Sequence, residues 1–469
     1  YAFPQPVDEG FDFSSHYAWN AHARGVQSGM PHRLQGFASN QENDPYRLDE
    51  NGYPRDHVTE EALRFLSKNK QHPTFLYYAS WLVHTPIQTR SKQLLEKYCE
   101  KLGVPYPEDP KGWTLEGQRN PYYCAMVETL DYYVGRLLEY LEETDDPRWS
   151  GHKLIENTYI IFSSDNGGME GHQNVVFTDN FPLDKGKIHI REGGIRVPFI
   201  ISGPRAKSGV VSEVVVNGLD FYPTILGWTG TANSAKQILD GSDLGPLLNK
   251  DPHDAGMIMD PATQKPRASM FWHFPNGYCQ QSAHLKNGYK LIYNHVYERQ
   301  RVELYQLYDD SGKRMDWEEV RDLSKEQPGL AREMKDELLR FLKDLDAGMT
   351  YYNPTCTRVK MPGAGKVISV IDQQLINRRV RLRYQNNGAE LVRARIIYSM
   401  NGTEKDSEWF PLDAKIIPAQ GNKPARVEAK LPPKASHYLY NLVDENNFMV
   451  TYPKLNRQDF GGSALRVLK

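Results

Sequence analysis

The amino-acid sequence predicts an α/β protein with a smaller α+β region and an all-β sandwich at its C-terminal end. Helix and strand patterns alternate over roughly the first 260 residues, as they do in α/β proteins. Short aromatic-rich strands and one helix follow, and about the last 110 residues contain strand patterns separated by turn signals. We therefore expect three domains, over residues 1–260, 261–352 and 353–469.

Composition excludes several classes of protein. A formal charge of −2 gives no electrostatic argument for nucleic acid or an anionic membrane as a partner. No stretch approaches about 18 apolar residues, so we expect no membrane span. The widely spaced cysteines form no CxxC pair, which disfavours a zinc knuckle or a dense disulfide framework. The four cysteines are Cys99, Cys124, Cys279 and Cys356.

The first helical pattern begins at residue 57 and has Leu63 and Leu66 on its apolar side. Residues 74–83 predict a strong strand, which a loop at His84 follows. A longer helix is expected in "YYCAMVETLDYYVGRLLEYLEE", because apolar residues recur there at helical spacing. These residues are Val127, Leu130, Val134, Leu137 and Leu141.

Two further strands are predicted on either side of a polar segment. Residues 158–162 are β-branched and aromatic, which is typical of a strand covered on both faces. The segment "VPFIISGP" predicts another buried strand that stops at Gly203 and Pro204. The segment "LDFYPTILGWTG" predicts a short helix with Asp220 as its N-cap.

The remaining elements belong to the α+β region and the sandwich. From about residue 265, "ASMFWHF", "YKLIYNH" and "VELYQLYD" predict short strands, and residues 328–345 predict a helix. Between residues 379 and 384, arginines alternate with apolar residues, which predicts one buried and one solvated face. Asn-Gly turn signals at residues 387 and 401 separate further strands, so we expect a small sandwich.

The stretch "SSDNGG" follows the strand at residues 158–162, at the edge of a sheet where open α/β proteins place ligands. Asp165 and Asn166 offer hard oxygen ligands for calcium or magnesium, and the two glycines allow close approach of a bound group. An isolated stretch of this kind is more often an Asx turn. About twenty residues later, a cationic loop enters the next strand and favours an anionic oxyester substrate. Its cationic residues are Lys185, Lys187, His189 and Arg191.

Several segments together resemble type I, formylglycine-dependent sulfatases, which belong to the alkaline phosphatase superfamily. They are "SSDNGG", "GKIHIREGGIRVPFIISGP", "LDFYPTIL" and "LDGSDLGPLL", with "DEGFDF" and "FLYYASWLVHTP" upstream and "FWHFP" and "NGYKLIYN" downstream. The resemblance covers roughly residues 8–350. It implies an alkaline-phosphatase-like mixed sheet sandwiched by helices, and it leaves the β-sandwich unexplained.

The resemblance implies roles for four residues. Asp165 and Asn166 match the acid and amide that bind Ca²⁺ in the family, and His84 matches a histidine that contacts the sulfate and is a candidate proton donor. The family's sulfate-binding lysine lies five residues before the Glu of "EGG" and five after the Pro of "PL", and both counts give Lys187 rather than Lys185. The residues alone also allow His84 to be a hydrogen-bonded loop histidine and Lys187 a surface charge.

The family pattern also exposes a gap. In the family, the nucleophile is a cysteine in C-x-P-S-R that is oxidised to formylglycine, and two N-terminal aspartates complete the calcium site. None of the four cysteines here has that context. The chain starts at "YAFPQPVDEG", without Met or signal peptide, and "GFDF" normally follows soon after the nucleophile region. We therefore expect the C-terminal three quarters of a sulfatase, inactive by itself.

The expected function is removal of sulfate from an organic ester, with a sulfated carbohydrate as substrate, Ca²⁺ as cofactor and a periplasmic or secreted location. One alternative is a phosphoester hydrolase of the same superfamily, although those tend to place a histidine where Asn166 supplies oxygen. Another is a non-catalytic carbohydrate-binding relative. Four aromatic residues could stack on a sugar or belong to the core. They are Trp81, Trp113, Trp272 and Tyr278.

Overall fold

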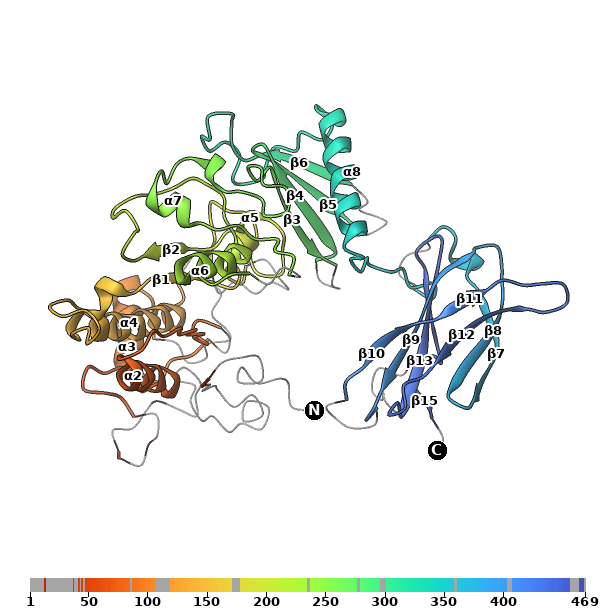
Figure 1. Cartoon of the computed structure of the whole chain (residues 1–469), viewed down its shortest axis with the longest axis horizontal. Coiled ribbons are helices and arrows are strands. Elements are labelled where there is room, and N and C mark those ends of the chain that lie inside the picture. Colours follow the sequence, from red (N-terminus) through yellow and green to blue (C-terminus); the bar gives the residue numbers. More distant parts are fainter. Residues whose placement is uncertain are drawn as a thin grey trace. The chain divides into compact units, whose positions relative to one another are not determined.

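A computed structural model of the chain describes residues 12–13, 37, 41–42, 44, 47–84, 87–106, 119–170, 178–233, 237–275, 279–295, 301–357, 361–402, 407–455 and 464–467. Two compact units are present (Figure 1). The larger unit comprises Phe13–Asn294 and Gln300–Ala347, and the smaller unit comprises Tyr1–Asp12, His295–Arg299 and Gly348–Lys469. The larger unit is a mixture of helices and antiparallel sheets and the smaller is rich in β-strands, which agrees with the predicted fold class.

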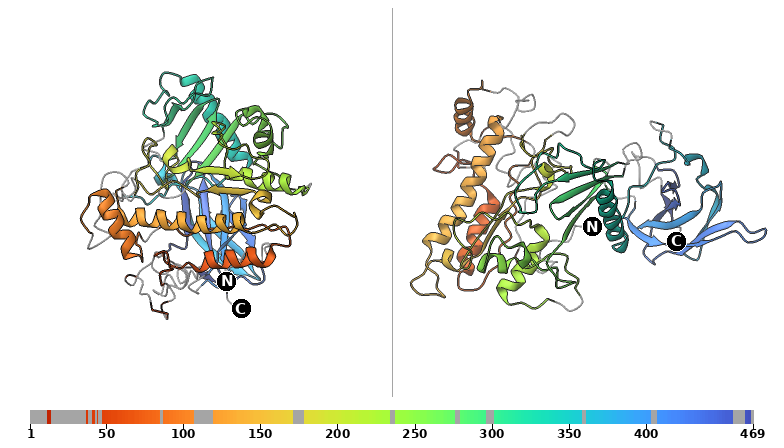
Figure 2. Two further views of the ribbon diagram at one scale, coloured as in Figure 1. Left: turned by 90° about the vertical axis from the view of Figure 1, so that its left-hand side faces the viewer. Right: turned by 90° about the horizontal axis from the view of Figure 1, so that it is seen from above.

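Helices α2 (His57–Asn69), α3 (Lys92–Leu102) and α4 (Pro121–Glu143) pack together in the larger unit. The long helix α4 runs beside α2 (Figure 2). Each helix begins at a polar N-cap whose side chain accepts a backbone N–H group, which satisfies donors that have no partner inside the helix. Among the described residues, no helix combines the length and apolarity needed to cross a membrane. The three N-caps are Asp56, Ser91 and Asn120.

The predicted long helix is confirmed as α4, but its buried face is not the predicted one. Leu137 and Leu141 are buried as expected, whereas Val127 is 44% exposed. Met126 and Tyr133 are buried instead, each one residue before a predicted apolar position. The buried face of the helix is therefore rotated by about one residue from the predicted face. Methionine and tyrosine bury more apolar area than valine, so the larger side chains decide which face meets the core.

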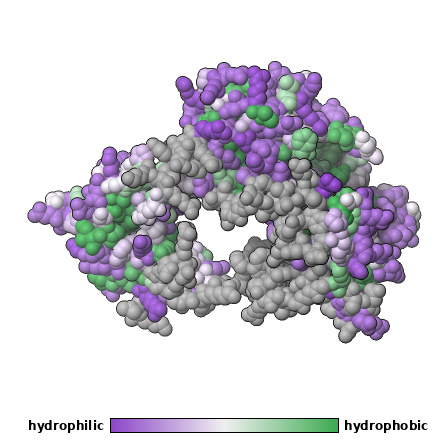
Figure 3. Space-filling view, turned by 180° about the vertical axis from the view of Figure 1, so that it is seen from behind, coloured by the Kyte–Doolittle hydropathy of each residue, from purple (hydrophilic) through white to green (hydrophobic). Residues whose placement is uncertain are grey.

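The strands that flank the candidate site are β1 (Ile160–Ser163) and β2 (Phe199–Ser202), and they pair antiparallel with each other. Both strands were predicted, but the prediction that β1 is covered on both faces is wrong. Phe162 and its cross-strand neighbour Ile200 are 37% and 60% exposed. An apolar run has the same composition whether one or both faces are covered, so the sequence could not separate these cases. Such exposed apolar side chains are normal in a mostly hydrophilic surface, and Figure 3 shows separate hydrophobic patches on the face in view.

The strand predicted over residues 74–83 is not formed in the described part of the chain. Residues 75–80 alternate between exposed and half-buried as in an extended strand, but no described strand pairs with them. Tyr78 instead holds the segment on the start of α2, where its hydroxyl lies 2.8 Å from the hydroxyl of Thr59. Burial raises the pKa of Tyr78 to about 12. A strand needs a neighbour that pairs with its backbone, and alternation alone does not supply one.

The segment after β2 forms the predicted helix α6 (Phe221–Thr229), followed by α7 (Gly245–Asn249). Asp220 precedes α6, but its side chain does not cap that helix. Its buried carboxylate accepts hydrogen bonds from Arg267 Nη1 at 2.6 Å and from the Ser242 N–H at 2.8 Å. This acid therefore ties together distant segments. Short 3-10 helices are η3 (Leu154–Asn157), η4 (Gly218–Asp220) and η5 (Ala255–Met257), with η7 (Ala364–Lys366) in the smaller unit.

The predicted α+β region is an antiparallel sheet in the order β3-β4-β5-β6, and helix α8 (Pro328–Asp344) packs on it (Figures 1 and 2). Three of the strands and the helix were predicted, whereas β4 was not. Its sequence, "QSAHLK", buries Ser282 and His284 beside two apolar residues, so it lacks the apolar alternation of a strand. The strands are β3 (Ser269–Phe274), β4 (Gln281–Lys286), β5 (Tyr289–Asn294) and β6 (Val302–Gln306).

The C-terminal strands form two sheets that share one apolar core, in the orders β10-β9-β13-β14 and β11-β12-β8-β7, with β15 paired to β13. The predicted alternation in β8 is confirmed, because Val380, Leu382 and Tyr384 are buried in that core. The strands are β7 (Ser369–Ile376), β8 (Arg379–Gln385), β9 (Leu391–Ser399), β10 (Phe410–Asp413), β11 (Lys415–Ile417), β12 (Ala425–Lys430), β13 (His437–Asp444), β14 (Met449–Tyr452) and β15 (Leu465–Arg466).

Candidate active site

Asp165 and Asn166 form a bend directly after β1, and we call them the acid–amide bend. Asp165 is exposed and Asn166 half-buried, and Ser164 Oγ closes the bend by donating to the Asn166 carbonyl at 2.9 Å. The carboxylate and the side-chain amide carbonyl are hard oxygen donors that fit Ca²⁺. Among the described residues, no group of three or more His, Cys, Asp or Glu side chains could hold a metal ion. Because calcium takes about 6 to 8 oxygen ligands, the bend supplies part of a coordination shell.

Glycines join this bend to the Lys187 loop, which we define as residues 184–191. The Gly167 N–H donates to the Gly194 carbonyl at 3.0 Å, and the Lys187 N–H donates to the Gly168 carbonyl at 2.8 Å. A Cβ atom on Gly186 would lie 2.0 Å from the Gly168 carbonyl oxygen, so no side chain fits between the two segments. The sequence suggested that glycines make room for a bound group, but here they bring two loops into backbone contact. We call Gly167, Gly168, Gly186 and Gly194 the glycine frame. It brings the segment of the acid–amide bend into contact with the segment of Lys187.

The Lys187 loop holds a constrained backbone. Lys185 and Ile188 have φ angles of 61° and 81°, in the left-handed region that a β-branched residue adopts only when its surroundings enforce it. Lys185 Nζ lies 3.7 Å from an Asp184 carboxylate oxygen. Lys187 is half-buried, and within the described part of the chain it has no acidic partner. These surroundings favour Lys187 over Lys185 as the ligand of an anion.

Asn180 was missed by the sequence analysis, yet it braces both segments. Its Nδ2 donates to the Gly168 carbonyl at 3.1 Å and to the Lys185 carbonyl at 3.0 Å. Its own backbone N–H donates to Glu170 Oε2 at 2.6 Å. A single asparagine in a polar segment carries no signal of such a role, because the role exists only once two distant loops meet.

Glu192, at the start of helix α5 (Glu192–Ile195), anchors the end of the loop to the β3–β6 sheet. Its carboxylate accepts from Lys290 Nζ at 2.7 Å and from Arg196 Nε at 2.6 Å, and the same lysine lies 2.9 Å from Glu319. Burial acts to raise the pKa of Glu192, but Lys290 and Arg196 outweigh it and hold the pKa below its usual value. The loop is thereby attached to the C-terminal part of the larger unit by buried ion pairs.

Arg191 was expected among the cations that face the substrate, and the structure corrects this. Its guanidinium pairs with the buried Glu303 and lies 4.9 Å from the centre of the Tyr305 ring. A guanidinium held by a buried carboxylate and an aromatic ring serves packing between segments. Arg191 therefore supports the loop rather than the substrate.

His84 lies in the turn after residues 74–83. Its N–H donates to the Trp81 carbonyl at 2.9 Å, and the two ring centres are 5.1 Å apart. Its side chain is exposed, and the next residues, Thr85 and Pro86, lie outside the described residues. The glycine frame links the segments that carry Asp165, Asn166 and Lys187, whereas His84 belongs to another turn. The roles of all four residues stay predictions.

The aromatic candidates for sugar stacking differ in their surroundings. Trp272 packs against the apolar cluster of the β3–β6 sheet, which favours a core role. Trp81 is half-buried beside His84 and stays a candidate. Trp113, Tyr278 and most of the "DEGFDF" motif lie outside the described residues.

Burial of the thiols in the larger unit disfavours the thiolate form, which is the reactive form of an unmodified cysteine. Burial raises the pKa of Cys99, raises that of Cys124, and raises that of Cys279 to about 11. A thiol with a raised pKa is protonated at neutral pH and reacts slowly. Cys356 is exposed and belongs to the smaller unit.

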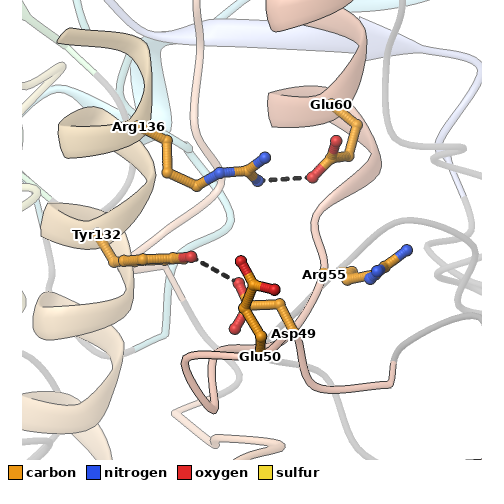
Figure 4. A pocket seen from close by; sticks show the side chains of 6 residues that line it. All are labelled: Asp49, Glu50, Arg55, Glu60, Tyr132 and Arg136. Carbon is orange, nitrogen blue, oxygen red and sulfur yellow. Dashed lines mark hydrogen bonds and ion pairs between the residues drawn. The ribbon is translucent and has the colours of Figure 1, made fainter. Parts of the chain in front are cut away.

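A polar pocket of about 220 Å³ lies beside α2 and α4 rather than at the acid–amide bend (Figure 4). Two contacts link its lining side chains: Arg136 Nη1 lies 2.6 Å from Glu60 Oε1, and the Tyr132 hydroxyl donates to Asp49 at 2.7 Å. None of the predicted site residues lines it. The lining residues are Asp49, Glu50, Arg55, Glu60, Tyr132 and Arg136.

Comparison with known proteins finds similar sequences for the part of the chain that carries these loops. Residues 9–231 match the family model described as Sulfatase. A protein named "Sulfatase" from Formosa agariphila is 32% identical over 312 residues, which cover 62% of this chain and 50% of that protein. Steryl-sulfatase of Homo sapiens is 28% identical over 196 residues, 41% of this chain and 29% of that protein. N-acetylgalactosamine-6-sulfatase of Canis lupus familiaris is 30% identical over 192 residues, 40% of this chain and 31% of that protein.

The chain thus spans half, or less, of the length of the relatives it matches. The matched residues 9–231 contain the acid–amide bend, the glycine frame and the Lys187 loop. Through these residues the chain is similar to sulfatases.

Proposed function

We propose that the protein hydrolyses sulfate esters and that its substrate is a sulfated carbohydrate. The observation that supports this proposal is the glycine frame, whose backbone contacts join the segment that carries two oxygen donors to the segment that carries Lys187. The relatives support sulfate as the group removed, because each of them is named as a sulfatase. One is named for a sulfated amino sugar and another for a steryl sulfate, so the carbohydrate is our extension. A periplasmic or secreted location would give such an enzyme access to polysaccharides.

In this proposal each residue has one task. Asp165 and Asn166 would hold Ca²⁺, which when bound neutralises charge on the sulfate oxygens. Lys187 donates from its ammonium group to a sulfate oxygen, and its backbone hydrogen bond to Gly168 fixes the point from which the side chain extends. His84 gives a proton to the leaving oxygen. The nucleophile is assigned to none of the four cysteines.

The reaction class can be tested with a matched pair of small esters. The full-length protein is assayed on 4-nitrophenyl sulfate and 4-nitrophenyl phosphate, with added calcium and with a calcium chelator. We expect faster turnover of the sulfate ester and loss of that turnover on chelation. Preference for the phosphate ester would favour a phosphoester hydrolase, and binding of sulfated sugars without turnover of either ester would favour a non-catalytic relative.

Calcium binding provides a test that does not depend on turnover. Replacing Asp165 by Ala removes the carboxylate of the acid–amide bend, so we expect calcium affinity to fall at least about tenfold by isothermal titration calorimetry. The fold should be retained because the side chain is exposed. Asp240→Ala is the matched control, since Asp240 is also exposed and lies outside the site. Equal calcium affinity in the two variants would show that Asp165 is not a ligand.

A further inference from the structure

Charge is distributed unevenly along the chain. Residues 348–469 contain 19 Lys and Arg against 10 Asp and Glu, which gives a formal charge of +9. The whole chain has a charge of −2, so the preceding 347 residues carry −11. The near-neutral total therefore conceals a basic C-terminal region, and an asymmetry of this kind is typical of proteins that bind a polyanion.

Part of this positive charge gathers on one face of the sheet β11-β12-β8-β7 in the smaller unit. The alternation of β8 buries its apolar residues and directs its arginines outward, and β12 follows the same pattern. Neighbouring charges on such a face are separated by about 5 Å across strands and about 7 Å along them. We define the basic face by its six outward cations and two outward acids. They are Arg379, Arg381, Arg383, Lys415, Arg426 and Lys430, with Asp372 and Glu428.

The two acids hold three arginines in place. Glu428 Oε1 accepts from Arg381 Nε at 2.7 Å and from Arg426 Nε at 2.8 Å. Asp372 Oδ1 accepts from Arg383 Nε at 2.7 Å. Exposed ion pairs of this kind contribute little to stability, so an incoming anion can compete with them. They orient the guanidinium groups and leave the face with an excess of four positive charges.

Like charges also lie directly opposite one another on adjacent strands. Arg379 faces Lys430, and Arg383 faces Arg426. Arg379, Lys415 and Lys430 are exposed, and the structure gives them no acidic partner among the residues it describes. Directly opposed like charges destabilise a sheet, and a bound anion would remove that repulsion.

We propose that the basic face binds a sulfated polysaccharide. The sulfated nature of the ligand rests on the proposed function, whereas its polyanionic nature rests on the charges of this face. A guanidinium presents paired N–H groups that fit the oxygens of an oxyanion, and a repeating array of cations fits a polymer with repeating sulfates. The described outward residues of the four strands include no aromatic side chain that could stack on bases, which favours a sulfated glycan over single-stranded nucleic acid.

The test uses the full chain and dextran sulfate as the probe. Binding is measured by biolayer interferometry at several NaCl concentrations, with unsulfated dextran and a DNA duplex of similar charge in parallel. The face variant is Arg379→Gln with Lys430→Gln. The control variant is Lys366→Gln with Lys434→Gln, which removes the same charge from exposed positions of the same unit that lie outside the basic face.

We expect the wild type to bind dextran sulfate with an affinity that falls as salt rises. The face variant should bind at least about tenfold more weakly, and the control variant within about twofold of wild type. Equal losses in the two variants, or wild-type binding to unsulfated dextran, would overturn the proposal. Tighter binding to the DNA duplex would replace it with nucleic-acid binding. Hydrolysis of 4-nitrophenyl sulfate by the full-length protein is measured separately, so that failure of the proposed function is distinguished from failure of polysaccharide binding.

Discussion

Lys185 and Lys187 lie two positions apart, but the fold treats them differently. Lys185 lies near Asp184, whereas the backbone N–H of Lys187 donates to Gly168, which follows the acid–amide bend. We expect Lys187→Met to lower kcat/KM for an aryl sulfate by about 100-fold or more, because one preorganised donor to a developing oxyanion is lost. Lys185→Met should change it by less than about threefold. Equal effects, or a larger effect at Lys185, would move the sulfate site to the other lysine.

Lys290 is a second residue whose surroundings define a sharp test. It is fully buried between Glu192 and Glu319, so Lys290→Met leaves two carboxylates without their shared cation. We expect the free energy of unfolding, measured by urea denaturation, to fall by about 3–5 kcal/mol. Lys286→Met, which breaks partly exposed pairs on α8, should cost less than about 1 kcal/mol. A small loss at Lys290 would mean that the buried ion pairs do not hold the loop.

At the level of elements, His284 connects β4 to its neighbours. Its Nδ1 donates to the Met334 carbonyl of α8 at 3.1 Å, and its Nε2 lies 3.0 Å from Ser269 Oγ of β3. Burial lowers the pKa of His284 below its usual value. As pH falls below about 6.5, the unfolded chain therefore gains a proton that the folded chain resists, and the free energy of unfolding decreases.

This dependence can be measured by urea denaturation between pH 7.5 and pH 5, values chosen to bracket the usual pKa of histidine near 6.5. Replacing His284 by Asn should flatten the decline over that range. His253→Asn, at an exposed turn, should keep the decline of the wild type. An unchanged slope in the His284 variant would place the titrating group elsewhere.

The elements also show what a single sequence can and cannot predict. α8 and β8 were predicted because each carries its periodicity within its own residues. Residues 74–83 have the alternation of a strand, but pairing depends on a neighbour that local sequence does not specify. Likewise, the residue types of the acid–amide bend were informative, whereas the bracing role of Asn180 arises from contact between distant loops.

The same distinction applies to charge in the whole molecule. A net charge of −2 gave no argument for a polyanionic partner, because a sum over the chain cancels opposite contributions from its two parts. The fold separates these contributions, since residues 348–469 fall in the smaller unit and most of the acidic remainder in the larger one. Charge thus becomes informative about partners once it is assigned to a unit and to a face of a sheet.

Removing residues 348–469 tests whether the basic C-terminal region is needed for binding of the polyanion. Hydrogen bonds tie Tyr352 to Asn447, and Asn447 to Thr350, so the structure supports a cut after Ala347 rather than after residue 352. We expect the shortened chain to unfold cooperatively and to keep its calcium affinity within about twofold. Its binding to dextran sulfate should fall at least about tenfold, because the basic face is gone and the remaining residues carry a charge of −11.

Loss of calcium affinity together with a broad unfolding transition would show that the β-sandwich is needed for the larger unit to fold. Retained binding to dextran sulfate would place the polysaccharide site within residues 1–347.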